Sequence, residues 1–171
     1  MNLDKISTGK NPPGEINVFV EIPYGAKVKY ELDKDSGVIF VDRFLHTAMF
    51  FPFNYGFIPG TKGEDGDPLD ALVVSKYEIA IGTVIPVKTI GLLEMEDEAG
   101  IDTKIVTVPS FKIDPFYSKY NDISELNEQT RKLIKHFFDH YKELEPGKWV
   151  KTKDFLGKEE AYEAIKKSIS K

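Results

Sequence analysis

The segment Glu15-Ile16-Asn17-Val18-Phe19-Val20-Glu21-Ile22-Pro23 decides the fold class of this chain. Its aliphatic side chains recur at every second position, which predicts a β-strand with one apolar face and with Glu21 on the other. Residues 27–33 and 38–44 alternate in the same way, and the turn-like Lys34-Asp35-Ser36-Gly37 joins them. The chain is therefore predicted to begin with three short strands.

Strands continue through the middle of the chain, and helices follow only near its end. Residues 46–68 form an aromatic loop that proline and glycine interrupt. Helical periodicity is predicted over 125–145 and 158–169, with one apolar stripe in each. The stripes consist of Ile134, Phe137, Phe138, Tyr141 and Leu144, and of Ala161, Ile165 and Ile169. Further strands are predicted at 69–75, 84–94, 101–108 and 148–153. This order predicts a mainly β protein with α-helices, in which a small β-barrel carries helices on its outside.

Composition limits the class of protein. A chain of 171 residues with 41% hydrophobic content suits one domain spanning 1–171. No apolar run reaches the roughly 18 residues of a membrane span, and the N-terminus lacks a signal pattern, so we expect a cytoplasmic protein with no membrane partner. The absence of cysteine excludes disulfides, thiolate zinc sites and thiol nucleophiles. A net charge of −5 argues against nucleic-acid binding and suits a protein that gathers divalent cations.

The motif Asp65-Gly66-Asp67-Pro68-Leu69-Asp70 is the most informative stretch for function. Its glycine and proline prevent a regular helix, so a tight bend can direct several carboxylates to one point, as Mg²⁺ or Mn²⁺ requires. A calcium-binding EF-hand loop that starts at Asp65 is excluded, because it needs glycine where the chain has Asp70 and glutamate where it has Lys76. The plain alternative is a solvated acidic turn.

Other polar residues decide between a metal site and an acidic turn. Asp97 and Asp102 bracket an expected hairpin turn, so two strand ends could bring them together, and Lys104 follows on the same strand face. Taken singly, each polar residue has an ordinary explanation, such as a solvated strand face or a core tyrosine. Together they mix carboxylates with cations, which suits a strongly anionic substrate that arrives with metal ions. The remaining members of this set are Lys29, Glu31, Arg43, Tyr141 and Lys142.

The chain resembles the family I soluble inorganic pyrophosphatases along nearly its whole length. The acidic motif at 65–70 matches that family's signature, and four other segments accompany it in the family's order. These segments are Val41-Asp42-Arg43-Phe44, Pro52-Phe53-Asn54-Tyr55-Gly56, Asp97-Glu98-Ala99-Gly100 and His136-Phe137-Phe138-Asp139-His140-Tyr141-Lys142. The resemblance implies an OB-like five-stranded β-barrel with two outer C-terminal helices. It also implies Mg²⁺-dependent hydrolysis of pyrophosphate to two orthophosphates and, commonly, a homohexamer.

The same resemblance implies a set of metal ligands. Asp65, Asp70 and Asp102 would hold one Mg²⁺, and Asp70 would also bind a second. Asp97 would join Asp102 in binding metal carried by the substrate. Glu21 and Glu31 would bind a further ion, largely through water. Mn²⁺ or Zn²⁺ could substitute for Mg²⁺, and Glu98 is a weaker candidate for an outer position.

The resemblance further implies that Asp67 is the general base. A water that bridges two cations has a lowered pKa, and Asp67 would accept its proton. Six side chains would grip the phosphoryl groups. They are Lys29, Arg43, Tyr55, Lys104, Tyr141 and Lys142. Phe51 is a departure, because many relatives carry tyrosine there, so position 51 cannot donate a hydrogen bond to phosphate.

Two other functions compete with this interpretation. An OB-type module could bind single-stranded nucleic acid on the aromatic residues of 46–68. That loop leads into Asp65, Asp67 and Asp70, however, whereas a groove for nucleic acid should be lined with Lys and Arg. A two-metal phosphohydrolase acting on a nucleotide or on polyphosphate is the stronger alternative, although no residue pattern indicates recognition of a base or ribose.

His136 and His140 are four residues apart and therefore share one helix face. A zinc site lacks support, because no adjacent glutamate completes the zinc-protease pattern. Two interpretations stay open, namely ordinary surface histidines and an interface between subunits of a hexamer. An interface histidine would be neutral at pH 7 and costly to protonate.

Overall fold

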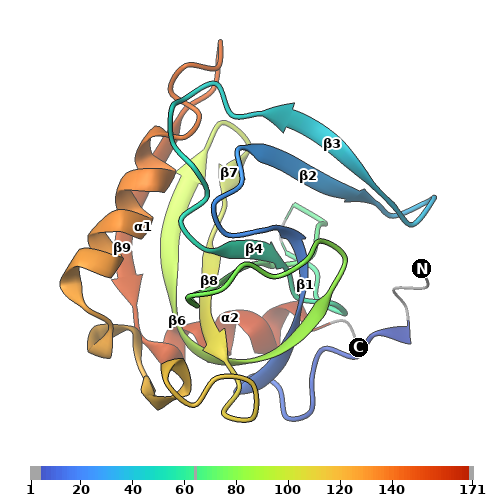
Figure 1. Ribbon diagram of the computed structural model, residues 1–171, viewed down its shortest axis with the longest axis vertical. Coiled ribbons are helices and arrows are strands. Elements are labelled where there is room, and N and C mark those ends of the chain that lie inside the picture. Colours follow the sequence, from blue (N-terminus) through green and yellow to red (C-terminus); the bar gives the residue numbers. More distant parts are fainter. Residues whose placement is uncertain (1–4, 64, 170–171) are drawn as a thin grey trace.

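The computed structural model describes residues 5–63 and 65–169 (Figure 1). Strands dominate this part of the chain, and two α-helices lie near its end. The strands are β1 (Glu15–Ile22), β2 (Val28–Asp33), β3 (Val38–Phe44), β4 (Asn54–Phe57), β5 (Asp70–Val73), β6 (Val84–Asp97), β7 (Gly100–Ile101), β8 (Lys104–Pro109) and β9 (Val150–Leu156). The helices are the short 3₁₀ turns η2 (Tyr117–Lys119) and η3 (Ile123–Glu125), and α1 (Glu128–His140) and α2 (Lys158–Ser168).

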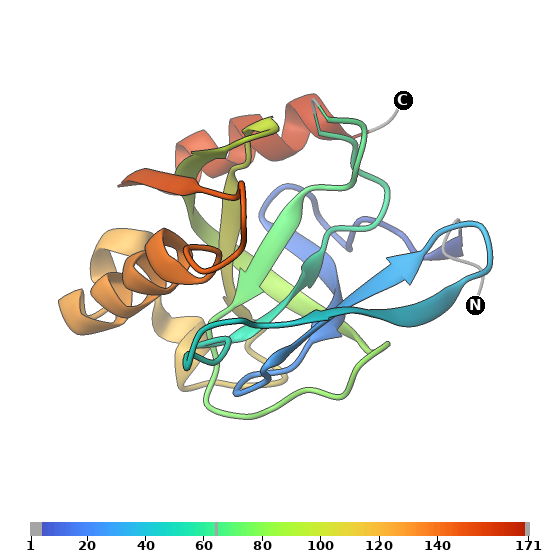
Figure 2. The same ribbon diagram turned by 90° about the horizontal axis from the view of Figure 1, so that it is seen from above.

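Five strands close into a barrel. In the order β1-β4-β5-β8-β6 each strand pairs with the next, and β6 pairs again with β1 to complete the ring. These pairings are antiparallel except for β5 with β8, which is parallel. Figures 1 and 2 show α1 and α2 outside the ring, on different sides of it. The prediction of an OB-like five-stranded barrel with two outer helices is confirmed.

The barrel strands are buried on both faces. Leu72 of β5 belongs to a cluster that includes Ile134 and Phe137 of α1. Its neighbours Ala71 and Val73 point the other way, into a cluster that includes Ile165 of α2. Because both of its faces are buried in apolar clusters, β5 has a continuous apolar sequence in place of alternation. Apolar packing therefore holds this strand on both faces.

Two glycines permit close approach of neighbouring chain segments. A Cβ at Gly56 of β4 would lie 1.8 Å from the backbone oxygen of Phe19, so β1 and β4 could not pair as they do. A Cβ at Gly91 of β6 would lie 2.6 Å from the backbone oxygen of Leu156 and 2.7 Å from Cβ of Ile123. Glycine at position 91 thus allows β9 and η3 to pack against the middle of β6.

Strands β2 and β3 form a separate two-stranded sheet. Figure 2 shows this hairpin extending away from the barrel. A small apolar cluster joins the two parts, in which Leu32 of β2 contacts Phe19 of β1 and Phe57 of β4. The rings of Phe19 and Phe57 stack with centroids 5.1 Å apart. The hairpin is therefore attached to the barrel mainly through a limited apolar contact and through polar side chains.

The structure corrects four expectations about the elements. The helix predicted over 125–145 is shorter, because Asn127 caps α1 by accepting from the Gln129 backbone and turns replace the helix after His140. Leu144 consequently lies outside the apolar stripe and is 62% exposed. β4 lies inside the predicted loop 46–68, where two prolines and a glycine concealed four residues of strand. The strand predicted over 101–108 is interrupted, since residues 102–103 separate β7 from β8.

The predicted strand at 84–94 is β6, which continues to Asp97 and so reaches the rim of the barrel. The expected turn between Asp97 and Asp102 is also present, because Asp97 of β6 pairs with Gly100 of β7. In residues 5–63 and 65–169, no helix has the length and apolar character needed to cross a membrane.

Candidate active site

A cavity of about 940 Å³ lies between the β2–β3 hairpin, the acidic motif and the end of β6. Its walls also include Lys29 and Lys34 of the hairpin and Tyr55 of β4. Seven of the lining residues in the described part of the chain are carboxylates. They are Glu21, Glu31, Asp65, Asp67, Asp70, Asp97 and Asp102. The structure therefore brings all the predicted acidic residues to one space, although they come from segments far apart in sequence.

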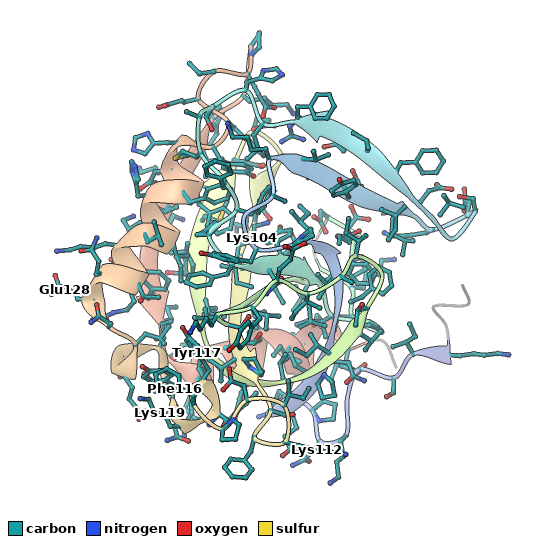
Figure 3. The ribbon with its side chains drawn as sticks, in the orientation of Figure 1. Lys104, Lys112, Phe116, Tyr117, Lys119 and Glu128 are labelled. Carbon is teal, nitrogen blue, oxygen red and sulfur yellow. The ribbon has the colours of Figure 1, made fainter. Side chains whose placement is uncertain are left out.

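Lys104 is the central cation of the site. Its side chain is only 3% exposed, and Figure 3 shows it in the middle of the molecule. The parallel register pairs Ala71 of β5 with Ile105 of β8, so the preceding residues Asp70 and Lys104 are neighbours. Lys104 Nζ donates to Asp70 Oδ2 at 2.5 Å and to Asp102 Oδ1. The buried charge is therefore paired twice.

Tyr55 completes this buried network. Its hydroxyl donates to Asp70 Oδ2 at 2.6 Å, and Lys104 Nζ lies 5.7 Å from the centre of its ring. Burial and the nearby charge of Asp70 raise the pKa of Tyr55 well above its usual value, so the phenol stays protonated. Burial would lower the pKa of Lys104, but Asp70 and Asp102 outweigh it and raise that pKa. Both groups thus remain hydrogen-bond donors at neutral pH.

A second cation, Lys142, lies beside the end of β6. Its Nζ donates to Asp97 Oδ2 at 2.7 Å, and the backbone N–H of Ala99 donates to Asp97 Oδ1 at 2.8 Å. Burial would raise the pKa of Asp97, but these two hydrogen bonds hold it below its usual value. Burial raises the pKa of Tyr141, which is enclosed in the core beside Lys142. Asp102 has a raised pKa because burial outweighs its contact with Lys104.

The hairpin contributes a separate set of charges. Lys29 Nζ lies 3.4 Å from Glu31 Oε2 and 3.0 Å from Asp42 Oδ2. Arg43 Nη1 donates to the same oxygen of Asp42. The expectation that Lys29 and Glu31 share a strand face is confirmed by their contact. Because Lys29 and Glu31 line the cavity, the hairpin supplies both signs of charge to it.

The acidic motif forms the tight bend expected from its sequence. Gly66 has a φ of +92°, which favours glycine, and the Gly63 backbone N–H donates to the Asp67 carbonyl at 2.6 Å. Asp65 Oδ1 accepts from the backbone N–H of Asp67 at 2.9 Å. The Asp67 carboxylate is 68% exposed and pairs with Lys34 of the hairpin turn. Asp67 therefore faces the open side of the cavity.

The donor chemistry of this cavity fits a hard divalent cation. Carboxylate oxygens are the ligands that Mg²⁺ and Mn²⁺ prefer. Among the residues that the structure describes, no three carboxylate or histidine side chains stand close enough to form a ready coordination shell. Lys104 holds Asp70 and Asp102 near each other, since its ammonium group binds one oxygen of each. Their other oxygens, Oδ1 of Asp70 and Oδ2 of Asp102, are the ones available to a cation.

Several contributors to the site were not anticipated. The sequence placed Lys34 in a turn and Asp42 in a family motif, without a role in the site. It gave Glu145 and Lys148 no role at all. Each of the four forms an ion pair with a residue of the site or beside it. Glu98, a weak candidate, pairs with Lys148. Phe51 is buried with its ring centroid 5.7 Å from that of Tyr55, so its missing hydroxyl affects a core position. No local sequence signal reveals Glu145 or Lys148, because their partners Arg43 and Glu98 lie far away in the chain.

Comparison with known proteins identifies the family. The sequence model described as inorganic pyrophosphatase matches residues 18–171. The chain belongs to the inorganic pyrophosphatase family. It is 57% identical to an inorganic pyrophosphatase of Aquifex pyrophilus, over 99% of this chain and 96% of that protein. An inorganic pyrophosphatase of Saccharolobus solfataricus is 53% identical over 98% of this chain and 97% of its own length.

Solved structures agree with this membership. The inorganic pyrophosphatase of Helicobacter pylori superimposes with a TM-score of 0.93 at 46% identity, covering 96% of each chain. The one from Thermus thermophilus has a TM-score of 0.92 at 41% identity, covering 99% of this chain and 97% of that one. The family predicted from the sequence, and with it the enzyme class of hydrolases acting on the pyrophosphate bond, is confirmed.

Glu21 allows a test of the electrostatics of this pyrophosphatase site. Its side chain is buried in β1, and Oε1 accepts from the Leu32 backbone N–H at 2.8 Å. Burial is the main cause that raises its pKa from 4.5 to about 7. A folded-state pKa above the unfolded value means that the native state holds the proton more tightly. The free energy of unfolding therefore falls as pH rises from about 4.5 to 7.

We expect Glu21→Gln to stabilise the metal-free protein by about 3 kcal/mol at pH 8 and by less than about 1 kcal/mol at pH 5. The amide keeps an acceptor for Leu32 and removes the buried charge. Urea unfolding in EDTA at both pH values would measure this. Glu15→Gln, an exposed change on the same strand, is the matched control. An equal gain at the two pH values would contradict a burial penalty on the charged form.

Proposed function

We propose that this chain hydrolyses inorganic pyrophosphate to two orthophosphates and that it depends on Mg²⁺. The observation that carries the proposal is a single cavity lined by seven carboxylates and by Lys29 and Lys34, with buried Lys104 bound to two of those carboxylates. Such a mixture suits a polyanion that binds together with divalent cations. The names of the matching family and of relatives that are about half identical support the same reaction.

The proposed metal ligands are Asp65, Asp70 and Asp102, with Asp97 and the pair Glu21 and Glu31 as partners of further ions. When bound, Mg²⁺ would offset the negative charge of pyrophosphate and make a water molecule more acidic. Mn²⁺ or Zn²⁺ are proposed substitutes. Lys104 keeps Asp70 and Asp102 oriented toward the cavity through its two hydrogen bonds. In this scheme Asp70 has a fixed position, because Tyr55 also donates to it.

Asp67 is proposed as the general base. It lies on the exposed bend of the acidic motif, and its backbone N–H is held by Asp65. A carboxylate that faces open solvent is accessible to a water molecule and can take its proton. Lys34, which pairs with one oxygen of Asp67, keeps the carboxylate directed across the cavity toward the hairpin.

Six side chains are proposed to bind the phosphoryl groups. Lys29 lines the cavity from the hairpin, and Arg43 is its neighbour in the register of β2 and β3. The other four come from the barrel and from the end of α1. Protonated Lys104 and Lys142 and the phenols of Tyr55 and Tyr141 are all donors at neutral pH. Donors aimed at phosphate oxygens stabilise the charge that develops on the departing phosphate. The full set is Lys29, Arg43, Tyr55, Lys104, Tyr141 and Lys142.

A phosphate-release assay tests the proposed substrate. With EDTA-treated protein and added Mg²⁺, we expect release from pyrophosphate to exceed release from ATP or from polyphosphate by at least about 100-fold in kcat/KM. Little release is expected without the added cation. Comparable rates on ATP or polyphosphate would instead support a two-metal phosphohydrolase with that substrate, and full activity in EDTA would contradict the metal requirement.

Replacing the proposed base gives a second test. Asp67→Asn preserves the shape of the side chain but removes the proton acceptor, so kcat should fall by roughly 10²–10⁴-fold near pH 7 while metal binding survives. The loss should shrink as rising pH supplies hydroxide. Asp35→Asn removes the same charge from the nearby hairpin turn and should have little effect. If Lys34→Gln lost as much activity as Asp67→Asn, the ion pair and not proton transfer would be the cause.

We also propose that the chain assembles as a homohexamer, with the outer face of α1 against a neighbouring subunit. His136 is exposed in a single chain, and the rings of His136 and His140 are 4.6 Å apart on that face. Phe40 and Phe44 of β3 are also more than half exposed. His140 Nδ1 lies 2.9 Å from Glu143 Oε2. A cytoplasmic location stays a prediction.

The hexamer should therefore dissociate below about pH 6, where an ordinary histidine becomes charged. Light scattering from pH 8 to pH 5 would follow the mass of the wild type and of the double variant His136→Gln with His140→Gln. His46→Gln, which changes an exposed histidine on a loop, is the control. A mass that does not change with pH in the wild type would show that these histidines do not govern assembly, and a monomer at pH 7.5 would contradict the hexamer itself.

A further inference from the structure

The segment that follows α1 carries three charged side chains, at positions 142, 145 and 148. The backbone N–H of Glu145 donates to the Lys142 carbonyl at 2.9 Å, and that of Lys148 donates to the Glu145 carbonyl at 3.1 Å. These are two successive turns and not a continuous helix, because Gly147 in the second turn has a φ of +75°. Lys142, Glu145 and Lys148 are instead each held by a side-chain partner elsewhere in the chain.

Each of these three side chains pairs with a different residue near the cavity. Lys142 binds Asp97, and Lys148 binds the adjacent Glu98, so both reach the end of β6. Glu145 binds Arg43 of β3, which lies 102 residues earlier in the chain. The segment therefore connects the barrel to the hairpin, and Glu145 is its contact with the hairpin.

The contact between Glu145 and Arg43 is enclosed and directional. The Glu145 side chain is 8% exposed, and its Oε1 accepts from Arg43 Nε at 2.9 Å. Nη1 of the same guanidinium donates to Asp42 Oδ2. A guanidinium is a rigid planar fork, so two held nitrogens fix the direction of the third, Nη2. Burial would lower the pKa of Arg43, but Glu145 and Asp42 outweigh it and raise that pKa.

The hairpin has supports other than Glu145. The hairpin already has its own backbone ladder between β2 and β3 and an apolar contact with the barrel. A largely buried ion pair also contributes little net stability, because the loss of hydration offsets the attraction. Its clearest physical effect is to fix the orientation of Arg43.

We propose that Glu145 is a positioning residue, which holds the guanidinium of Arg43 so that its free edge meets a phosphoryl group of the substrate. This inference rests on the proposed function, in which Arg43 binds pyrophosphate. Glu145 itself does not touch the substrate, so its effect is transmitted through Arg43 and should appear in binding more than in turnover.

The test compares Glu145→Met, which removes the acceptor, with Glu145→Gln, which keeps an acceptor without the charge. We expect Glu145→Met to raise the KM for pyrophosphate by about 10-fold while kcat changes less than about threefold. Glu145→Gln should show a smaller rise. Glu128→Gln is the matched control, since Glu128 lies at the far end of α1 and pairs with exposed Lys132 (Figure 3). Thermal unfolding of each variant reports on its folding.

Repeating the test in a variant of Arg43 separates this inference from the proposed function. Residues that act through one another are not additive, so in an Arg43→Lys background Glu145→Met should have no further effect on KM. If Arg43→Lys weakens pyrophosphate binding but Glu145→Met does not, or if the two effects add, the positioning role is wrong and the proposed role of Arg43 stands. If Arg43→Lys leaves KM unchanged, the proposed role of Arg43 fails. A melting temperature that falls in step with the loss of activity would show a structural role for Glu145.

Discussion

The ammonium group of Lys104, held between the carboxylates of Asp70 and Asp102, is the interaction on which the rest of the site depends. A buried cation is costly unless its donors are satisfied, and this one is satisfied only because β5 and β8 lie parallel and start side by side. The same contact gives Asp70 its orientation, and Tyr55 strengthens it from β4. Three strands of the barrel thus meet in one network of hydrogen bonds.

Around this network the site has two parts with different supports. The barrel part rests on two apolar clusters, each covered by one helix, and its strands are held by pairing on both sides. The hairpin part has a single apolar contact and a chain of charges from Lys29 through Asp42 and Arg43 to Glu145. Apolar packing therefore positions the side chains of the barrel part, whereas electrostatic contacts position those of the hairpin part.

Much of the fold follows from local sequence pattern, because alternation and helical stripes report directly on which faces are buried. β4 was missed because four residues between prolines carry too little pattern, and it exists only through its neighbours β1 and β5. Lys104 was placed beside Asp102 by spacing, but its pairing with Asp70 depends on a parallel register that no local signal reveals. The contact of Arg43 with Glu145 spans 102 residues and was equally hidden. The roles given to the carboxylates came from family resemblance and not from pattern.

The attachment of the β2–β3 hairpin has a mechanical consequence. Lys29, Glu31 and Lys34 all lie on it and line the cavity, so two cations and a carboxylate of one wall belong to a single structural unit. A tilt of the hairpin about its apolar contact would displace them together, without breaking a hydrogen bond of the barrel ladder. The binding of an anion and the coordination of a cation would then weaken in the same movement. Such coupling would let two product phosphates leave the cavity while Lys104 and its partners remain in place.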